Sequence, residues 1–204
     1  MFIVFEGLDG VGKTTQAKRL CDYYLAWGRE VVFTKEPGGG GDFCLKLREA
    51  MLSHKTSSLS DLFLIYSARN EHIINTIIPA LNEGKIVICD RFFYSSIAYF
   101  CYESGWKNSK EREIVNYFQS LMPDVRPDLC LIFDCDTVVL NDRINIRSDA
   151  NKLDLFDLET KNKIKNCFID LAKTGEYSSK IIDSSRDIDA IFNDVLTCCQ
   201  DLEK

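Results

Sequence analysis

A short apolar segment at the start of the chain leads directly into a glycine-rich turn. Residues 2–5 are rich in β-forming side chains, and Gly7-x-x-x-x-Gly12-Lys13-Thr14 follows them at once. Beyond the turn, apolar residues recur at helical spacing until Gly28. A strand, a glycine-rich turn and a helix start form the context that a phosphate-binding loop requires. This stretch therefore predicts an α/β fold with a nucleoside triphosphate site beside its first strand.

The chemistry of such a loop explains the spacing of its residues. Backbone N–H groups curl around a phosphate chain, and the N-terminus of the following helix adds the positive end of its dipole. Lys13 then reaches the β- and γ-phosphates, and the Thr14 hydroxyl ligates Mg²⁺. A chance match is disfavoured by the strand before the turn and the helix after it. The predicted nucleotide-binding residues are Gly7, Leu8, Asp9, Gly10, Val11, Gly12, Lys13, Thr14 and Thr15.

Composition excludes several classes of protein. The 204 residues suit one domain, and 46% hydrophobic with 27% charged residues is ordinary for a soluble globular chain. A net charge of −6 argues against a nucleic-acid-binding surface. Met1 leads straight into the first strand without a signal peptide, and no apolar run approaches the roughly 18 residues of a membrane span. The nine cysteines, an odd number without C-x-x-C, indicate reduced thiols. We expect a cytoplasmic protein that binds neither membranes nor nucleic acid.

Strand patterns alternate with helical patterns along the rest of the chain. Further strands are expected at 31–34, 86–90, 129–134 and 181–183, and the fully apolar third strand is expected to be central. Helices are expected at about 45–52, 59–81, 93–103 and 110–121. Three more are expected: one that begins near 138, one that ends near 173, and one near the C-terminus. This alternation predicts a P-loop NTPase-like three-layer α/β sandwich, a five-stranded parallel sheet flanked by helices, in one domain over 1–204. The turns after the first three strands should share one cleft.

Two charged residues directly follow the third predicted strand. Asp90 is suited to hold Mg²⁺ through water opposite Thr14, and Arg91 to clamp an anion in the cleft. The alternative for Asp90 is a carboxylate that only caps the next helix, but the end of a parallel strand favours function. Arg48 and Arg69 lie on helices after the second strand, and the apolar surroundings of Arg69 disfavour a solvated role.

Several motifs occur in an order that resembles the thymidylate kinase family over nearly the whole chain. They are Phe-Glu-Gly-Leu-Asp-Gly-Val-Gly-Lys-Thr-Thr at 5–15, Thr-Lys-Glu-Pro-Gly-Gly at 34–39, Ser-Ala-Arg at 67–69, Asp-Arg-Phe-x-x-Ser-Ser-x-Ala-Tyr at 90–99, and Arg-Pro-Asp-Leu at 126–129 followed by Asp134. The second motif has Lys35 where the family has arginine. The resemblance implies transfer of phosphate from ATP to dTMP with Mg²⁺.

The same resemblance implies how the acceptor dTMP is held. Asp9 would face the deoxyribose 3′-hydroxyl and the metal, Arg48 and Arg91 would hold the dTMP phosphate, and Tyr99 would lie under the sugar and disfavour a 2′-hydroxyl.

For the thymine base, Glu36 and Pro37 would shape the site. Arg69 would donate to a thymine carbonyl, and Ser96 would address the base edge.

The family also implies the catalytic groups, and no general base is needed because the nucleophile is an anionic phosphate oxygen. Catalysis then reduces to alignment and charge neutralisation. Bacterial-type members supply arginines from a lid, which we expect at about 147–155. Arg147 is present, but the second lid position holds Lys152, which cannot make the same bidentate contact, so Arg147→Ala should lose activity and Lys152→Ala should be mild. The implied catalytic residues are Lys13, Asp9, Arg91 and Arg147, with Arg143 beside the ATP phosphates and a homodimer as the assembly.

Two departures concern the base site. The family usually has an aromatic residue four positions before Arg69, where this chain has Ile65. Phe63 and Tyr66 are the alternatives for that role, although neither lies at the right helical angle by simple counting. Phe100 stands where a glutamine commonly follows the tyrosine. These changes, with the altered lid, predict a slower enzyme with more tolerant base recognition.

Other functions remain open at this point. A deoxynucleoside kinase acting on thymidine shares the loop and the Asp-Arg pair, and would use Glu36 as a base for a 5′-hydroxyl. A GTPase-like switch is disfavoured, because the only D-x-x-G lies inside the phosphate loop. The N-K-x-D match at 151–154 follows a polar stretch instead of a buried strand, and we interpret it as a coincidence.

Overall fold

The computed structural model describes residues 1–104, 107, 109–137, 140, 153 and 155–202. The predicted lid arginine Arg147, Lys152 and Arg143 lie outside the described residues. The strands are β1 (Phe2–Gly7), β2 (Val31–Lys35), β3 (Ile86–Asp90), β4 (Leu129–Asp134) and β5 (Ser179–Asp183). The helices are α1 (Lys13–Ala26), α2 (Asp42–Ser53), α3 (Ser58–His72), η1 (Ile73–Ile77), α4 (Ile78–Asn82), α5 (Phe93–Cys101), α6 (Lys110–Leu121), α8 (Leu158–Ala172) and α9 (Ile188–Gln200).

The strands form one parallel sheet in the order β2-β3-β1-β4-β5. Every residue of β1 and β3 is buried, whereas β2 and β5 at the edges are partly exposed. This difference is expected when helices cover both faces of the sheet, because only the edge strands then reach solvent. The predicted α/β sandwich is confirmed. The third strand is an interior strand of the sheet, as its apolar sequence indicates, but the middle strand is β1.

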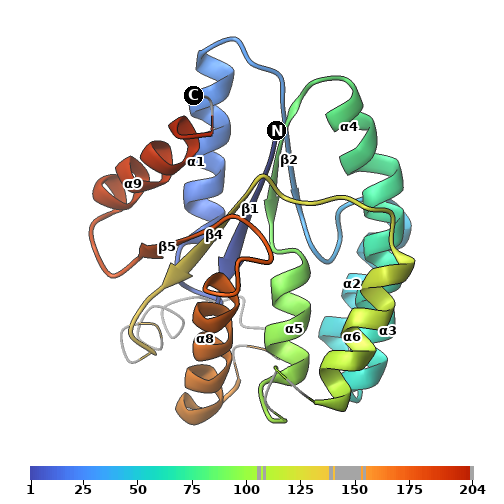
Figure 1. Ribbon diagram of the computed structural model, residues 1–204. Coiled ribbons are helices and arrows are strands. Elements are labelled where there is room, and N and C mark those ends of the chain that lie inside the picture. Colours follow the sequence, from blue (N-terminus) through green and yellow to red (C-terminus); the bar gives the residue numbers. More distant parts are fainter. Residues whose placement is uncertain (105–106, 108, 138–139, 141–152, 154, 203–204) are drawn as a thin grey trace.

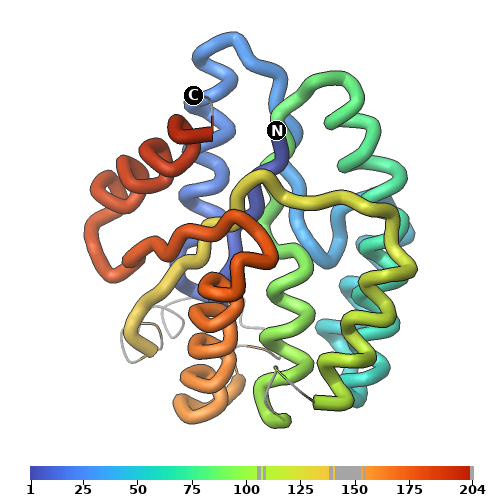
Figure 2. The backbone as a smooth tube through the Cα atoms, viewed as in Figure 1, coloured from blue at the N-terminus to red at the C-terminus, as the bar shows by residue number. Residues whose placement is uncertain are grey.

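Helices cover the sheet in two layers (Figure 1). Helices α1 and α9 pack against each other on one face, and α5 and α8 pack against each other on the other. Helices α2, α3 and α6 lie side by side beyond α5 (Figure 1). The path of the backbone through the same layers can be followed from the N-terminus to the C-terminus in Figure 2. The core lies between these layers and is built mainly from the strands, with ring pairs such as Phe5 and Phe133, whose centroids are 5.5 Å apart.

The predicted helix over 59–81 forms, but it is not a uniform α-helix. A π-helical segment, Ile73–Ile77, joins α3 to α4. Pro79 occupies the first turn of α4. Proline has no N–H to bond back along a helix, so a local change of hydrogen-bonding pattern is expected just before it. The sequence pattern indicated the apolar face of this helix but not the π-helical segment within it.

The register of the sheet places the functional turns at one edge. Asp90 pairs with Phe5 on one side and with Lys35 on the other. The ends of β2 and β3 are therefore level and β1 extends two residues further, to Gly7, so the turns that follow the three strands emerge at the same edge. Ligand sites in such folds lie at this edge.

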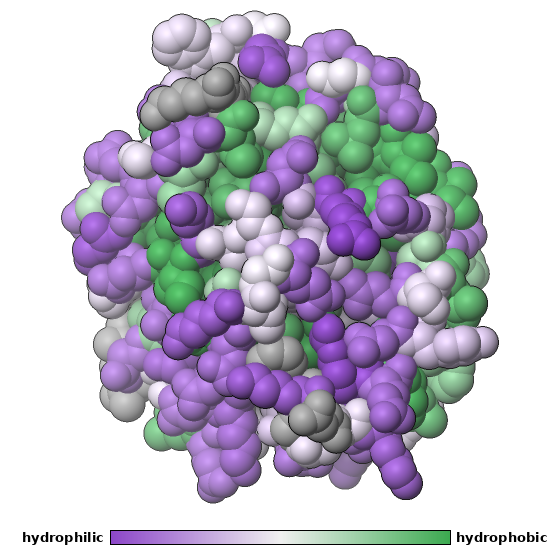
Figure 3. Space-filling view, viewed as in Figure 1, coloured by the Kyte–Doolittle hydropathy of each residue, from purple (hydrophilic) through white to green (hydrophobic). Residues whose placement is uncertain are grey.

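Much of the surface is hydrophilic, with separate apolar patches on the face shown in Figure 3. All nine cysteines are free thiols, eight of them buried and Cys198 half-buried. Among the helices that the structure describes, none is long and apolar enough to cross a membrane.

Candidate active site

The phosphate-binding loop has the geometry that its sequence predicts. The side chains of Leu8 and Val11 point into the core, with 5% and 2% exposure, which leaves the backbone of the loop facing outward. At Gly7, a Cβ atom would lie 2.6 Å from the carbonyl oxygen of Phe133 on β4, so no other residue fits there. Helix α1 begins directly after Gly12, which has no side chain to cap it. The first N–H groups of α1 are thus available to an anion.

Lys13 is held inside this loop. Its Nζ donates to the Leu8 carbonyl oxygen at 2.6 Å. Burial, together with repulsion from Arg91, lowers the pKa of Lys13 to about 8. A lysine kept partly desolvated in this way interacts strongly with an incoming phosphate, because little water has to be displaced from it.

Thr14 and Asp90 meet at the carboxyl end of the sheet. The Thr14 hydroxyl donates to Oδ2 of Asp90. The other oxygen, Oδ1, is buried and has no hydrogen-bond partner among the described residues. A hydroxyl beside a carboxylate with one open oxygen is a donor set that suits Mg²⁺, which prefers oxygen ligands and retains several waters. The residues present therefore fit the metal that the sequence predicts.

Arg91 connects the loop with the turn after β3. Its Nη2 donates to Oδ1 of Asp9 at 2.8 Å and to the Tyr99 hydroxyl at 3.3 Å. Its Nη1 donates to the Gly7 carbonyl oxygen and to Ser95 Oγ, both at 2.9 Å. Burial by itself would lower the pKa of Arg91, but the neighbouring Asp9 holds it well above its ordinary value. The guanidinium is a fixed cation at the mouth of the cleft.

A residue that sequence reasoning missed supports this arginine. Glu6 is fully buried and accepts hydrogen bonds from the N–H groups of Phe92 at 2.8 Å and Ser95 at 3.1 Å, and from Ser95 Oγ at 2.5 Å. Burial raises the pKa of Glu6 despite these donors. The carboxylate caps the start of α5 and anchors the backbone next to Arg91, whose φ of 75° is unusual for a residue with a side chain. The available signal was a charged residue in an otherwise apolar strand.

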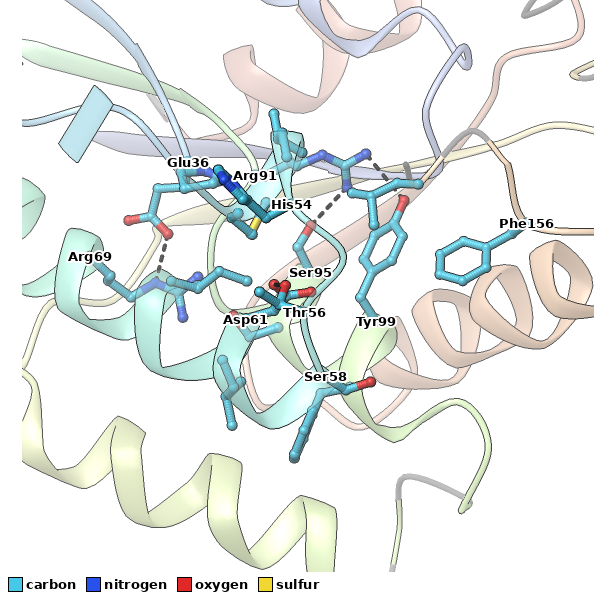
Figure 4. Close-up of a pocket in the computed structure, with 18 of the residues that line it drawn as sticks. Glu36, His54, Thr56, Ser58, Asp61, Arg69, Arg91, Ser95, Tyr99 and Phe156 are labelled. Atoms are coloured by element: carbon cyan, nitrogen blue, oxygen red, sulfur yellow. Dashed lines mark hydrogen bonds and ion pairs between the residues drawn. The ribbon is translucent and has the colours of Figure 1, made fainter. Parts of the chain in front are cut away.

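A cavity of about 630 Å³ opens beside Arg91 (Figure 4). Six of the eight residues predicted to bind dTMP line it: Glu36, Pro37, Arg69, Arg91, Ser96 and Tyr99. The other two are bonded to residues that line the cavity. Asp9 accepts a hydrogen bond from Arg91, and Nη1 of Arg48 donates to the Pro37 carbonyl oxygen at 2.9 Å. Burial and the nearby positive charge of Arg91 lower the pKa of Arg48. The second and third predicted turns thus share one cleft, with the loop at its rim.

The deep end of the cavity carries two polar groups without partners. Arg69 is 2% exposed, and its guanidinium carbon lies 4.6 Å from the centre of the Phe93 ring. Its Nη1 and the Ser96 hydroxyl are both buried and have no hydrogen-bond partner within the described part of the chain. Buried polar groups are normally paired, so these two indicate a ligand that supplies complementary atoms.

Both positions at which the base site differs from the family pattern lie in the wall of the cavity. Ile65 and Phe100 both line the cavity, as the motif alignment requires. Phe63 is instead 54% exposed and packs edge-on against Phe118 at 5.2 Å, while Tyr66 stacks on Phe118 in the core. Neither ring lines the cavity, so neither takes the place of an aromatic residue at position 65.

Sequence reasoning also missed one apolar wall of the cavity. Leu153, Leu155 and Phe156 come from the segment before α8, and the Phe156 ring is directed toward Tyr99 (Figure 4). On the α5 side, Tyr102 packs against Phe156 with ring centroids 5.8 Å apart. The available signal was the apolar character of Leu153 and Leu155 inside the predicted lid and of Phe156 directly after it, but periodicity does not show which cavity such residues line.

Glu36 is poorly suited to act as a base. Its Oε2 accepts from Arg69 Nε at 2.6 Å, and its Oε1 lies 2.9 Å from His72 Nδ1. Burial alone would raise the pKa of Glu36, but the charge of Arg69 and the bond to His72 hold it below its usual range. A carboxylate that must deprotonate a hydroxyl needs the opposite shift. The site therefore favours an acceptor that is already an anion.

Comparisons with known proteins agree with this geometry. The family model described as thymidylate kinase matches residues 5–195. A thymidylate kinase of Mycoplasmoides gallisepticum is 35% identical over 198 residues, covering 96% of this chain and 92% of the relative. One of Wolbachia pipientis is 40% identical over 174 residues, covering 84% and 85%. The crystal structure of thymidylate kinase from Ehrlichia chaffeensis superposes with a TM-score of 0.78 at 32% identity, covering 98% of each chain.

Proposed function

The chain belongs to the thymidylate kinase family and phosphorylates dTMP to dTDP with ATP, and from this premise we propose how its residues divide the work. The loop residues 7–15 bind ATP, with Lys13 on the transferred phosphate. The cavity beside Arg91 takes dTMP. The observation that carries this division is Arg91 itself, which bonds both the loop and the cavity wall.

On the acceptor side, Arg48 and Arg91 hold the dTMP phosphate at the mouth of the cavity. Tyr99 lies under the sugar, and Asp9 faces the 3′-hydroxyl. At the deep end, Nη1 of Arg69 donates to a thymine carbonyl and Ser96 bonds the base edge. The two unpartnered groups support this orientation, because a pyrimidine offers both of them a hydrogen-bonding edge.

For the transfer step, we propose alignment and charge neutralisation without a general base. Lys13 and Arg91 neutralise charge on the phosphates from opposite sides. Mg²⁺, when bound, would supply further positive charge, and Thr14 and Asp90 would hold it. Arg143 and Arg147, assigned to the ATP phosphates and to the lid at 147–155, stay predictions outside the described residues.

We also propose a homodimer of single-domain subunits in a reducing compartment such as the cytoplasm. Of the two helical stretches at 59–81 and 93–103, the second is mostly buried as α5, which leaves the first as the better candidate for the dimer face. Its exposed apolar side chains, such as Leu59, Phe63 and Ile74, support this choice. The nine free thiols support a reducing compartment.

The test is coupled ADP release with ATP and Mg²⁺, offering dTMP, dUMP, dCMP, dGMP and thymidine in parallel. We expect turnover with dTMP to exceed the others, with dUMP next because position 65 is not aromatic. Turnover with thymidine and none with dTMP would overturn the assignment of the acceptor cavity.

A further inference from the structure

A chain of buried polar groups runs from β2 to the deep end of the cavity, and phosphoryl transfer does not account for it. Thr34 lies near the end of β2 and Glu36 directly follows that strand, and Arg69 and His72 come from α3. Oγ1 of Thr34 lies 2.7 Å from Nε2 of His72, Nδ1 of His72 lies 2.9 Å from Oε1 of Glu36, and Nε of Arg69 lies 2.6 Å from Oε2 of Glu36. The exposed fractions of the four residues are between 1% and 8%.

The two bonds to Glu36 have a defined direction. Glu36 is held ionised by Arg69 and therefore only accepts hydrogen bonds. Nδ1 of His72 must then carry a hydrogen and donate it to Glu36. In the neutral ring, Nε2 is left as an acceptor for the Thr34 hydroxyl. Glu36 thus fixes a hydrogen on Nδ1, and Thr34 bonds the other ring nitrogen.

The glycine-rich turn after β2 is shaped around His72. A Cβ atom on Gly39 would lie 2.4 Å from His72 Nε2 and 2.4 Å from Thr34 Oγ1. A Cβ atom on Gly40 would lie 2.7 Å from His72 Cα. A side chain on Gly39 is excluded by the imidazole itself, and one on Gly40 by the backbone of His72. The run of glycines is explained by a backbone that passes directly over this histidine.

We propose that His72 is a positioning residue for acceptor recognition, which fixes the Glu36 carboxylate and, through it, the direction of Arg69 in the cavity. The proposal rests on the proposed role of Arg69 toward the acceptor base. With both carboxylate oxygens bonded, Glu36 cannot rotate, and Nη2 of Arg69 is held on the Phe92 carbonyl oxygen at 3.0 Å. The remaining nitrogen, Nη1, is then the one presented to the base.

Removal of the His72 bond leaves a buried acceptor oxygen on Glu36 without a partner. The carboxylate then turns or takes up water to satisfy it, and Arg69 loses its fixed direction. The effect falls on the acceptor and on the preference between pyrimidines. The ATP site is spared, because Lys13 and its loop make no bond with these four residues among the contacts described.

Two substitutions of similar polarity separate positioning from packing. In His72→Asn, the amide nitrogen occupies the place of Nδ1 and keeps the bond to Glu36. In His72→Gln, the amide reaches the place of Nε2 and keeps only the bond to Thr34. We expect dTMP affinity, measured by calorimetry on the full chain, to stay near wild type for Asn and to weaken on the order of 10-fold for Gln. The KM for ATP should not change in either variant.

Equal weakening in both variants, together with equally lowered melting temperatures, would overturn the proposal in favour of a packing role. A double variant tests the route: in an Arg69→Met background, His72→Gln should have no further effect on dTMP affinity, and an additive loss would count against transmission through Arg69. If Arg69→Met alone leaves dTMP affinity intact, the proposed function of Arg69 fails. Should that variant not fold, the Asn and Gln pair still decides the matter.

Discussion

Nη2 of Arg91 lies 2.8 Å from Oδ1 of Asp9, and this ion pair joins the phosphate-binding loop to the turn after β3. The two residues are 82 positions apart in the sequence. The contact places one cation between the donor loop and the acceptor cavity. Approach of two polyanions to each other requires such a charge, since their phosphates otherwise repel.

We therefore expect Arg91→Lys to be severe although it keeps the charge. One ammonium group cannot reproduce the bonds to Asp9, Gly7 and Ser95 from a single planar fork. The expected loss in kcat is about 10²- to 10³-fold, as for removal of a preorganised charge at a reacting centre. Steady-state kinetics with both substrates varied measure it. The matched control is Arg126→Lys, where the side chain is 72% exposed and should leave kcat unchanged.

Because the pKa of Lys13 is lowered, we expect kcat/KM for ATP to depend on pH. Its pKa of about 8 in the ligand-free protein means that the protonated form is lost as pH rises through 8. Only the protonated amine attracts phosphate, so kcat/KM for ATP should fall above pH 8. At saturating ATP the triphosphate favours the charged form, and kcat should stay level to higher pH. A kcat/KM for ATP that is constant from pH 7 to about 9.5 would contradict this sign.

Asp90→Asn should change the metal requirement. The substitution keeps the size of the side chain but removes the negative charge beside Thr14, so we expect the Mg²⁺ concentration for half-maximal rate to rise by about 10-fold or more. Titration of Mg²⁺ at fixed ATP measures this. Asp124→Asn, at an exposed carboxylate, serves as the control. An unchanged Mg²⁺ midpoint in Asp90→Asn would remove Asp90 from the metal site.

Ile65→Phe should tighten acceptor binding. Position 65 lines the cavity on the same helix as Arg69, and an aromatic ring there can stack on a flat base. Stacking on an aromatic side chain contributes about 1–3 kcal/mol per base, which corresponds to a KM for dTMP lower by roughly 5-fold or more. Phe63→Ile, outside the cavity on the same helix, is the control. A raised KM in Ile65→Phe would mean that Phe100 already fills this space.

Local sequence patterns were sufficient for the elements and for the first set of site residues. The period-two and period-3.6 patterns depend on neighbouring residues, so the strands and most helices are found where they are expected. Lys13 and Thr14 were recognisable from the glycine-rich motif between the first strand and the first helix. Asp90 and Arg91 were recognisable because they stand at the carboxyl end of an apolar strand, and strand ends of a parallel sheet share one edge.

The sequence by itself thus determined the parallel α/β fold, the phosphate loop and the charged turns beside it. Only the tertiary structure decided which distant side chains meet: Glu6 with Ser95, His72 with Glu36, and Phe156 facing Tyr99. The physical reason is that such pairs depend on the strand order and on the rotation of each helix about its axis. Periodicity identifies the buried face of a helix, but it does not identify the residue on the other side of the contact.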